Sequence, residues 1–104
     1  MHNMIYLIGR IVEDLKEYED REEVIIHLKV NNNFDGSDTI EVPILLKNSI
    51  CKHTMEYCEK GALVGIKGML VKYNDEFVAS VDRITFLASA NKIKEEDKEL
   101  LKDE

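Results

Sequence analysis

The sequence predicts an all-β domain that contains one helix. Three observations support this prediction. The 104 residues, 44% of them hydrophobic, suffice for one domain with one core. Apolar and polar residues alternate in several short segments, as in half-buried strands. Before residue 90, only one segment has helical spacing. The predicted order is three strands, a helix and two strands, closed into a five-stranded Greek-key barrel.

The first two predicted strands flank an acidic turn. Residues 4–12 are rich in β-branched residues, and the isolated Gly9 among them indicates a bend or a close backbone approach. Residues 24–30 alternate strictly, so one face of that strand is expected to be buried. Residues 13–23 have no clean period and hold seven acids and two bases, and they are interpreted as a turn.

The third predicted strand, residues 39–47, follows a polar loop over residues 31–38. It contains the only proline of the chain, Pro43, which cannot donate to a ladder and therefore predicts an edge position or a bulge. Strand alternation places Glu41 outside the barrel and Ile44 in the core.

The predicted helix begins with Asn48 or Ser49 as its cap and ends after Lys60, where Gly61 supplies a left-handed stop. Tyr57 on this helix is expected to pack against the barrel. The last elements are a strand over residues 62–73 with Gly65 and Gly68, a tight turn at Asn74-Asp75, and a strand over residues 76–87.

Five strands, one helix between the third and fourth, and glycines where strands must bend are the signature of the OB-fold. The predicted domain spans residues 1–90, and an acidic, Lys/Glu-rich tail over residues 91–104 follows it. The sequence contains no internal repeat and no linker.

The distribution of charge is more informative than the net charge of −7. The turn over residues 13–23 carries a net −5 and the tail over residues 91–104 a net −2, so the rest of the chain is neutral. A ligand surface is therefore expected on the neutral body. The absence of a basic excess argues against a purely electrostatic nucleic-acid binder. No apolar run has the roughly 20 residues of a membrane span and the start does not resemble a signal peptide, so a cytoplasmic location is expected.

The residues that could carry chemistry do not cluster. Cys51 and Cys58 lie seven positions apart on the predicted helix, too far for a disulfide, and are interpreted as core residues. The three histidines have no carboxylate or thiol at catalytic or metal-binding spacing. We therefore expect no metal, no cofactor and no enzymatic activity.

Three segments resemble the bacterial single-stranded DNA-binding protein family. The first is Ile5-Tyr6-Leu7-Ile8-Gly9-Arg10-Ile11, which is similar to the opening strand of the family. The second runs from Glu56 to Leu70 and contains a tyrosine near the helix end, then Lys60-Gly61 and a strand with Gly68-Met69-Leu70. The third is Ile84-Thr85-Phe86-Leu87, and the resemblance covers residues 4 to 88. It implies an OB-fold that binds single-stranded DNA and assembles as a dimer or tetramer through its first strand and sheet faces.

The chain differs from this family where the family stacks DNA bases on aromatic side chains. Two of the aromatic positions fall on Glu41 and Lys47, and a third falls on Phe34. The hairpin at Asn74-Asp75 is short, and the tail ends in acidic residues without a closing apolar pair. Each stacked base contributes roughly 1–3 kcal/mol, so losing two platforms costs about 2–6 kcal/mol. We therefore expect weak, salt-sensitive binding.

The candidate nucleic-acid-binding residues combine cations with aromatic rings. Phe34 could stack a base or pack locally, and Tyr73 could stack a base or cap its hairpin. Each cation alone fits a solvated surface, but several on one face would form a phosphate track. Tyr6 is assigned to the core or a subunit interface. The candidate residues are Arg10, Lys29, Phe34, Lys47, Lys67, Lys72 and Tyr73.

Two functions follow from these residues. The first is a non-catalytic single-stranded DNA-binding protein of replication, recombination or repair. The second keeps the fold as a protein-interaction module, such as an accessory replication or primosome-type factor with little DNA affinity. The acidic segments favour the second, because they suit basic partner surfaces and repel DNA.

Overall fold

A computed structural model describes residues 1–90, and the predicted tail over residues 91–104 lies outside the described part. Five strands form a closed barrel in the order β1-β2-β3-β5-β4, which confirms the predicted OB-fold. The elements are β1 (Ile5–Ile11), the 3₁₀ helix η1 (Leu15–Tyr18), β2 (Glu23–Asn31), β3 (Thr39–Lys47), α1 (Asn48–Tyr57), β4 (Leu63–Tyr73) and β5 (Glu76–Ala88).

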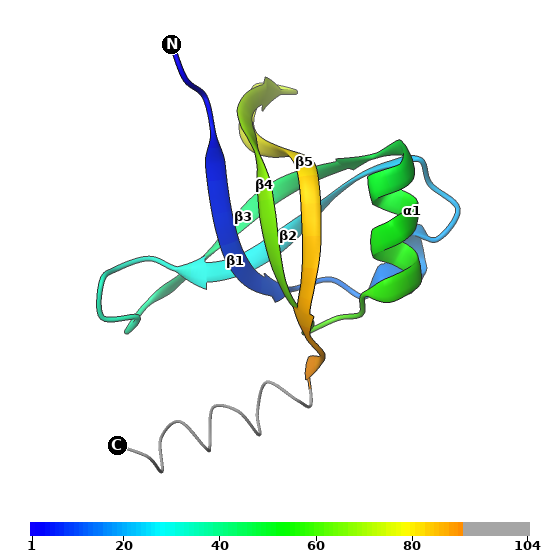
Figure 1. Cartoon of the computed structure of the whole chain (residues 1–104), viewed down its shortest axis with the longest axis horizontal. Coiled ribbons are helices and arrows are strands. Elements are labelled where there is room, and N and C mark those ends of the chain that lie inside the picture. The colour runs from blue at the N-terminus through cyan, green and yellow to red at the C-terminus, as the bar shows by residue number, and fades with distance from the viewer. Residues whose placement is uncertain (91–104) are drawn as a thin grey trace.

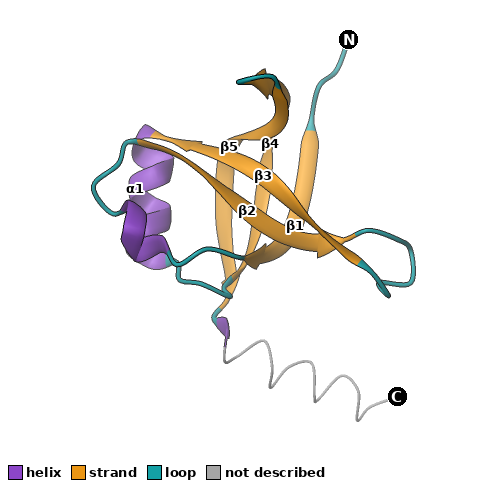
Figure 2. Ribbon diagram, turned by 180° about the vertical axis from the view of Figure 1, so that it is seen from behind, coloured by secondary structure: helices purple, strands orange, loops and turns teal. Residues whose placement is uncertain are grey.

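The barrel has two crossed layers. In Figure 1, β1, β4 and β5 stand in front, and the β2–β3 ribbon crosses behind them; Figure 2 shows this ribbon from its own side. The layers join where β3 pairs in parallel with β5, at Ile44 with Ala79 and Leu45 with Ser80. α1 covers one end of the ribbon, and the loop over residues 32–38 projects from the opposite end (Figures 1 and 2).

Every strand contributes buried side chains to the core. β2 buries each even-numbered residue from Val24 to Val30, which confirms its predicted period. The residues that fill the barrel centre are at most 3% exposed, and each fully buried Leu, Ile or Val contributes about 1.5–3 kcal/mol. They include Ile26 and Leu28 of β2, Ile44 and Leu46 of β3, and Val64 and Ile66 of β4.

Pro43 was predicted to mark an edge position or a bulge, but β3 lies between β2 and β5 in the closed barrel and pairs with β2 in unbroken register. Pro43 is opposite His27 in the β2–β3 ladder and precedes Ile44, the first β3 residue paired with β5. The backbone N–H of His27 donates to the Glu13 carboxylate, and its carbonyl accepts from Val12, so both groups point away from Pro43. The missing N–H of Pro43 therefore removes no bond from the ladder with β2.

The helix differs from its prediction at both ends. Its cap is Lys47, which makes no side-chain capping bond, and Asn48 is already the first helical residue, at φ +53°. The helix ends at Tyr57 rather than Lys60, because the Cys58 N–H closes the last turn onto the Thr54 carbonyl. Among residues 1–90 no helix is long and apolar enough to cross a membrane.

Gly61 has the expected left-handed backbone, at φ +86°, but it lies in the turn between α1 and β4 and does not end the helix. Its N–H donates to the Ile11 carbonyl at 2.8 Å, which ties this turn to the end of β1. The tight β4–β5 turn is confirmed, because Asn74 and Asp75 have φ of +50° and +64°. Two consecutive residues with positive φ fit a type I′ hairpin.

The acidic segment over residues 13–23 is more structured than the predicted turn. It contains η1, whose first residue, Leu15, is buried in the core. The Asp14 carboxylate caps η1 by accepting from the Lys16 N–H at 3.1 Å. One apolar residue among many acids has no detectable period, so the sequence pattern could not reveal this helix.

Gly68 lies at a bulge in the β4–β5 pairing, where a side chain would collide with the neighbouring strand. A Cβ at Gly68 would lie 2.0 Å from the backbone oxygen of Ser80, whereas a Cβ at Gly65 would meet only side chains, at 3.7 Å or more. We expect Gly68→Ala to lower the free energy of unfolding by at least about 2 kcal/mol, since a backbone strand must shift. Gly65→Ala is the matched control and should change it by no more than about 0.5 kcal/mol. Urea denaturation measures both; equal effects would contradict the close approach.

Candidate nucleic-acid interface

The outer face of the β2–β3 ribbon carries two of the predicted site residues, Lys29 and Lys47, and three more, Arg10, Phe34 and Tyr73, lie at its borders. Because the even-numbered residues of β2 are buried, its odd-numbered residues point outward. Nine residue pairs at roughly 3.3 Å per residue give a face about 26 Å long. We call this face the β2–β3 strip; its pairs are Glu23 with Lys47, Ile25 with Leu45, His27 with Pro43, Lys29 with Glu41, and Asn31 with Thr39.

One end of the strip contains a groove of about 300 Å³, the Tyr73 groove. Tyr18 and Arg21 enter it from the β1–β2 connection, and Tyr73 enters from the β4–β5 hairpin. The Arg21 guanidinium lies 5.4 Å from the centre of the Tyr18 ring, within cation–π range. The floor is formed by Ile25 and Leu45 of the strip. Two aromatic rings and a guanidinium over an apolar floor suit a stacked base and its phosphate.

The other half of the strip contains a second groove of about 420 Å³, the Arg10 groove. Arg10 of β1 is directly opposite Lys29 of β2, so the two cations lie side by side on the barrel surface. Gly9 lies beneath them and permits the contact between the strands, since a Cβ there would be 2.6 Å from the Lys29 carbonyl oxygen. The groove continues to Asn31, which also borders the surface of the β2–β3 loop.

The β2–β3 loop holds Phe34 in water at the end of the strip. The Phe34 side chain is fully exposed, with a relative accessibility of 112%, so local packing does not explain it. Side-chain hydrogen bonds shape the loop: the Ser37 N–H donates to the carboxamide of Asn33 and to the carboxylate of Asp35, at 3.0 and 2.9 Å. Hydrogen bonds from Ser37 lower the pKa of the Asp35 carboxyl. The bond from the Ser37 backbone N–H has the larger effect, and the bond from its hydroxyl has the smaller one. The ring is thus presented on a loop whose backbone is already ordered.

Carboxylates accompany the basic side chains and the histidine of the strip. Glu23 forms an ion pair with Lys47 at 3.8 Å, and both side chains are about half exposed. The Glu13 carboxylate accepts from the backbone N–H of His27 and contacts its ring. Glu41 is exposed and opposite Lys29. Phosphates must compete with these carboxylates for the same cations, so the strip offers less attraction than its cations alone would provide.

Two predicted site residues lie elsewhere. Lys67 points outward from β4, in a row with Tyr6 of β1 and Arg83 of β5. Lys72 is next to Tyr73 on β4, and because successive side chains of a strand alternate, it lies on the opposite face of the hairpin from the Tyr73 groove. The sequence could not separate these lysines from Lys29, since all three follow the same alternating pattern.

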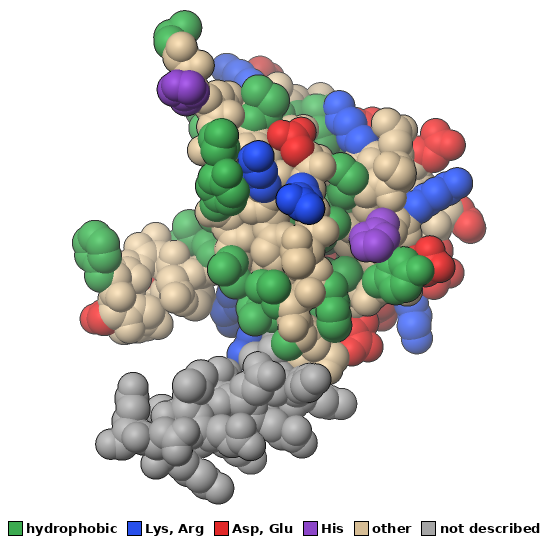
Figure 3. Space-filling model, in the orientation of Figure 1, with side chains coloured by type: hydrophobic (Ala, Val, Ile, Leu, Met, Phe, Trp, Pro, Cys, Tyr) green, Lys and Arg blue, Asp and Glu red, His purple; other side chains and the backbone are tan. Residues whose placement is uncertain are grey.

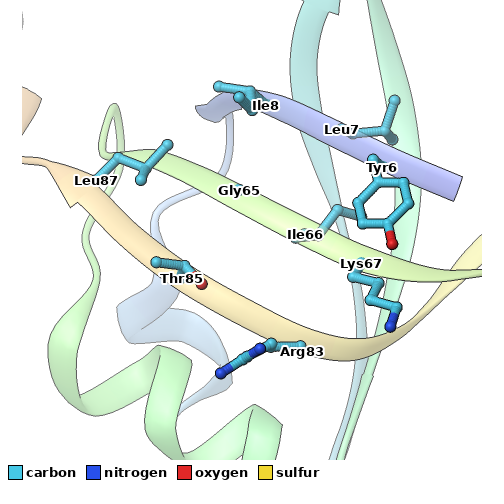
Figure 4. Close-up of a pocket in the computed structure, with 9 residues that line it drawn as sticks. All are labelled: Tyr6, Leu7, Ile8, Gly65, Ile66, Lys67, Arg83, Thr85 and Leu87. Carbon is cyan, nitrogen blue, oxygen red and sulfur yellow. The ribbon is translucent and has the colours of Figure 1, made fainter.

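A third groove, of about 460 Å³, lies on the layer formed by β1, β4 and β5. Figure 3 shows hydrophobic side chains gathered over this layer around a few basic ones. Figure 4 shows Ile8 and Leu87 on either side of Gly65 at one end, and Tyr6 beside Lys67 at the other. We call it the β1–β4–β5 groove. Tyr6 is 65% exposed, so its assignment to the core is wrong. The other alternative for Tyr6, a subunit interface, stays a prediction.

The helix carries an aromatic pair, His53 and Tyr57, on its exposed surface. Tyr57 was expected to pack against the barrel, but it is 59% exposed. Its ring lies 4.7 Å from that of His53, four residues earlier on the same face of α1. Tyr57 is the last residue of α1, and its side chain leans back over the preceding turn toward His53.

Two residues that line the Tyr73 groove, Tyr18 and Arg21, were not among the predicted site residues. Both lie in the acidic segment over residues 13–23, where seven acids obscured the only aromatic residue and one of two bases. A usable signal was present, because the loops after the first and fourth strands of an OB-fold flank its ligand-binding face. An aromatic residue and an arginine in the first of those loops are therefore candidates by position.

The chemistry-bearing side chains of the described residues are dispersed over the barrel. Within residues 1–90, no group of three or more His, Cys, Asp or Glu residues could hold a metal ion. Cys51 is buried and Cys58 is half-buried, both are free thiols, and burial raises the pKa of each. A raised thiol pKa reduces the fraction of reactive thiolate, which fits the predicted packing role.

The fold matches solved structures of single-stranded DNA-binding proteins. One crystal form of the mitochondrial single-stranded DNA-binding protein Rim1 from S. cerevisiae superposes with a TM-score of 0.68 at 18% identity, covering 86% of this chain and 97% of that chain. A second form superposes with a TM-score of 0.67 at 22% identity, covering 86% and 99%. No protein-family model and no curated protein matches the sequence. At such low identity the likeness establishes the fold.

Proposed function

We propose that this protein binds single-stranded DNA, without catalysing a reaction, along the β2–β3 strip. The observation that carries the proposal is that the Tyr73 groove, the Arg10 groove and the Phe34 loop all border this one face. In the OB-fold, the face of strands 2 and 3 and its flanking loops is the usual surface for oligonucleotides. The likeness to Rim1, a single-stranded DNA-binding protein, supports the same ligand.

The proposed mechanism divides binding between rings and cations. Phe34 stacks a base at one end of the strip, and Tyr18 and Tyr73 are the platforms at the other end. Arg10 and Lys29 neutralise phosphates between them. The role in the cell is then in DNA replication, recombination or repair, and the two free cysteines fit the reducing cytoplasm.

Fluorescence anisotropy with a labelled oligo-dT at low and physiological salt tests this proposal. We expect a Kd below about 10 μM at low salt and a negative slope of log K against log salt. Lys29→Ala should flatten that slope by about 0.7, the value for one phosphate contact on a single strand. Lys72→Ala removes the same charge from the opposite side of the hairpin and should leave the slope unchanged. Equal effects of the two variants would contradict binding at the strip.

A specific observation favours the alternative function, a module that binds basic protein surfaces. The acidic segment between β1 and β2 exposes its carboxylates to solvent around η1, at Asp14, Glu17, Glu19, Asp20 and Glu22. An exposed acidic patch attracts basic partners and repels DNA. No detectable oligo-dT binding at low salt would favour this function over the first.

We also propose that the chain assembles as a dimer through the edge of β1, or as a tetramer in which sheet faces of two such dimers also pack together. In the described residues, β1 pairs with β4 along Ile5 to Arg10, but with β2 only at Arg10 and Ile11. The Ile11 N–H donates to the Ala62 carbonyl just before β4, and the Val12 N–H donates to the His27 carbonyl of β2. Backbone N–H groups alternate in direction along a strand, so those of Tyr6 and Ile8 point to the same side as that of Val12, where this part of β1 has no partner strand. An open apolar edge without lysine or proline is a template for pairing with another strand.

Light scattering at about 50 μM protein should therefore give the mass of a dimer or tetramer. Ile8→Lys places charges on the edge and should shift the mass toward the monomer. Ile40→Lys, at a 44%-exposed position on β3, is the matched control and should not. A monomeric wild-type protein would rule out this assembly without affecting the DNA-binding proposal.

A further inference from the structure

His27 lies in the middle of the β2–β3 strip, where it is opposite Pro43. On one side of it lies the floor of the Tyr73 groove, Ile25 and Leu45, and on the other side lies Lys29 of the Arg10 groove. Successive outward residues of a strand are about 6.6 Å apart, so each groove begins one such step from His27. The His27 side chain is 40% exposed. A DNA strand that runs along the strip and occupies both grooves must therefore cross this imidazole.

The Glu13 carboxylate fixes the orientation of the imidazole. One of its oxygens accepts the backbone N–H of His27 at 2.8 Å, and the other lies within hydrogen-bond distance of the ring Nδ1. A carboxylate only accepts hydrogen bonds, so we assign the ring proton of neutral His27 to Nδ1. The directions of the two ring nitrogens diverge, so Nε2 faces away from Glu13. Nε2 is therefore the ring nitrogen that a ligand on the strip would meet.

The charge at this point of the strip depends on the protonation of His27. With a neutral imidazole, the Glu13–His27 pair carries the single negative charge of the carboxylate, which repels phosphate. A second ring proton, at Nε2, cancels this charge and turns a hydrogen-bond acceptor into a charged donor that suits a phosphate oxygen. Histidine is the only side chain whose ordinary titration falls between pH 5 and 8.

Further charged side chains lie on the elements around His27. Lys29 lies two positions along β2, and Glu41 lies diagonally across on β3. Arg10 of β1 is opposite Lys29, and Arg21 of the β1–β2 connection lines the Tyr73 groove. Lysine, arginine and glutamate ordinarily keep their charge between pH 5 and 8. Among these groups, His27 is therefore the one whose charge changes in that range.

We propose that His27 is a further DNA-contact residue of the strip and that its protonation strengthens binding to single-stranded DNA. The protonated ring donates from Nε2 to a phosphate oxygen of the strand that crosses it. This inference rests on the proposed function, because it adds a contact to the same surface. The DNA-bound state holds the second ring proton more tightly than the free state, so by linkage the affinity increases as pH falls through the histidine range.

Anisotropy titration of the full-length protein with oligo-dT at pH 8 and pH 5.5 tests the proposal. Thymine does not titrate in this range, the oligonucleotide has no terminal phosphate, and its dye is insensitive to pH. We expect binding at least about threefold tighter at pH 5.5, as for one exposed ion pair. The slope of log K against log salt should also be steeper by about 0.7 at pH 5.5, the value for one phosphate contact.

His27→Gln and His53→Gln are a matched pair of variants. Glutamine is uncharged at both pH values, so His27→Gln should have the same Kd at pH 5.5 as at pH 8. His53 is exposed on α1 and borders β5 rather than the strip, so His53→Gln should keep the whole pH effect. His27→Lys carries a permanent charge and should bind at pH 8 about as tightly as the wild type at pH 5.5. Thermal unfolding at both pH values checks that each variant is folded.

The outcomes separate this inference from the proposed function. An unchanged Kd of the wild type between pH 8 and pH 5.5 would overturn the role of His27 and leave DNA binding at the strip intact. The role of His27 would also be wrong if the pH effect persisted in His27→Gln, because another group would then hold the proton. No binding of oligo-dT at either pH would overturn both proposals.

Discussion

Glu41→Trp is expected to increase the affinity for oligo-dT at least tenfold. Glu41 is exposed in the middle of the outer face of β3, opposite Lys29 and next to the Arg10 groove. The substitution removes a negative charge that repels phosphates and adds a platform worth roughly 1–3 kcal/mol per stacked base. A gain of 1.4 kcal/mol already corresponds to about tenfold in Kd. Anisotropy titration measures the gain, and thermal unfolding shows whether the variant is folded.

Glu41→Gln separates the two effects of this substitution. It removes the charge without adding a ring, so its gain should be smaller than that of Glu41→Trp, and the difference between the two variants measures the contribution of the stacked base. A stable Glu41→Trp protein with unchanged affinity would show that the β2–β3 strip does not contact DNA. The protein-interaction function would then be favoured.

Phe34→Ala is expected to weaken oligo-dT binding by about 1–3 kcal/mol, or roughly 5- to 150-fold in Kd. The salt slope should not change, because a ring releases no counterions. The Phe34 ring contributes nothing to the core, since it is fully exposed, and the loop is held by Asn33, Asp35 and Ser37. The melting temperature should therefore remain that of the wild type.

Phe77→Ala is the matched control for this prediction. Phe77 is also exposed, at 66%, but it is opposite Lys72, on the side of the β4–β5 hairpin away from the Tyr73 groove. Its removal should leave the affinity within about twofold of wild type. Equal losses in both variants would indicate nonspecific stacking on any exposed ring rather than binding along the strip.

The sequence was sufficient to predict elements that depend on local chemistry. Strict alternation in β2 predicted its buried face, because strand geometry alone sends successive side chains to opposite sides. Asn74-Asp75 predicted a tight turn, because these residue types tolerate positive φ. Gly9 predicted a close approach, which the structure places against the Lys29 carbonyl. These features, with the element order, were enough to predict the barrel.

The positions of both helix ends depended on tertiary contacts. Asn48 has the residue type of a cap, but its N–H is taken by the Glu22 carbonyl from the preceding connection. The Gly61 N–H bonds to Ile11 of β1, so this glycine serves a turn between distant segments. Neither partner is close in sequence, and local spacing therefore placed both helix ends wrongly.

The candidate interface was only partly predictable for the same reason. Alternation could place Lys29, Lys67 and Lys72 outside the barrel, but only the pairing of strands shows that Arg10 joins Lys29 while Lys67 joins Tyr6. The sequence by itself determined the residue types on each strand face, because side-chain direction follows from backbone geometry. The closed order β1-β2-β3-β5-β4 decided which faces meet, because hydrogen bonds between strands join residues that lie tens of positions apart in the chain.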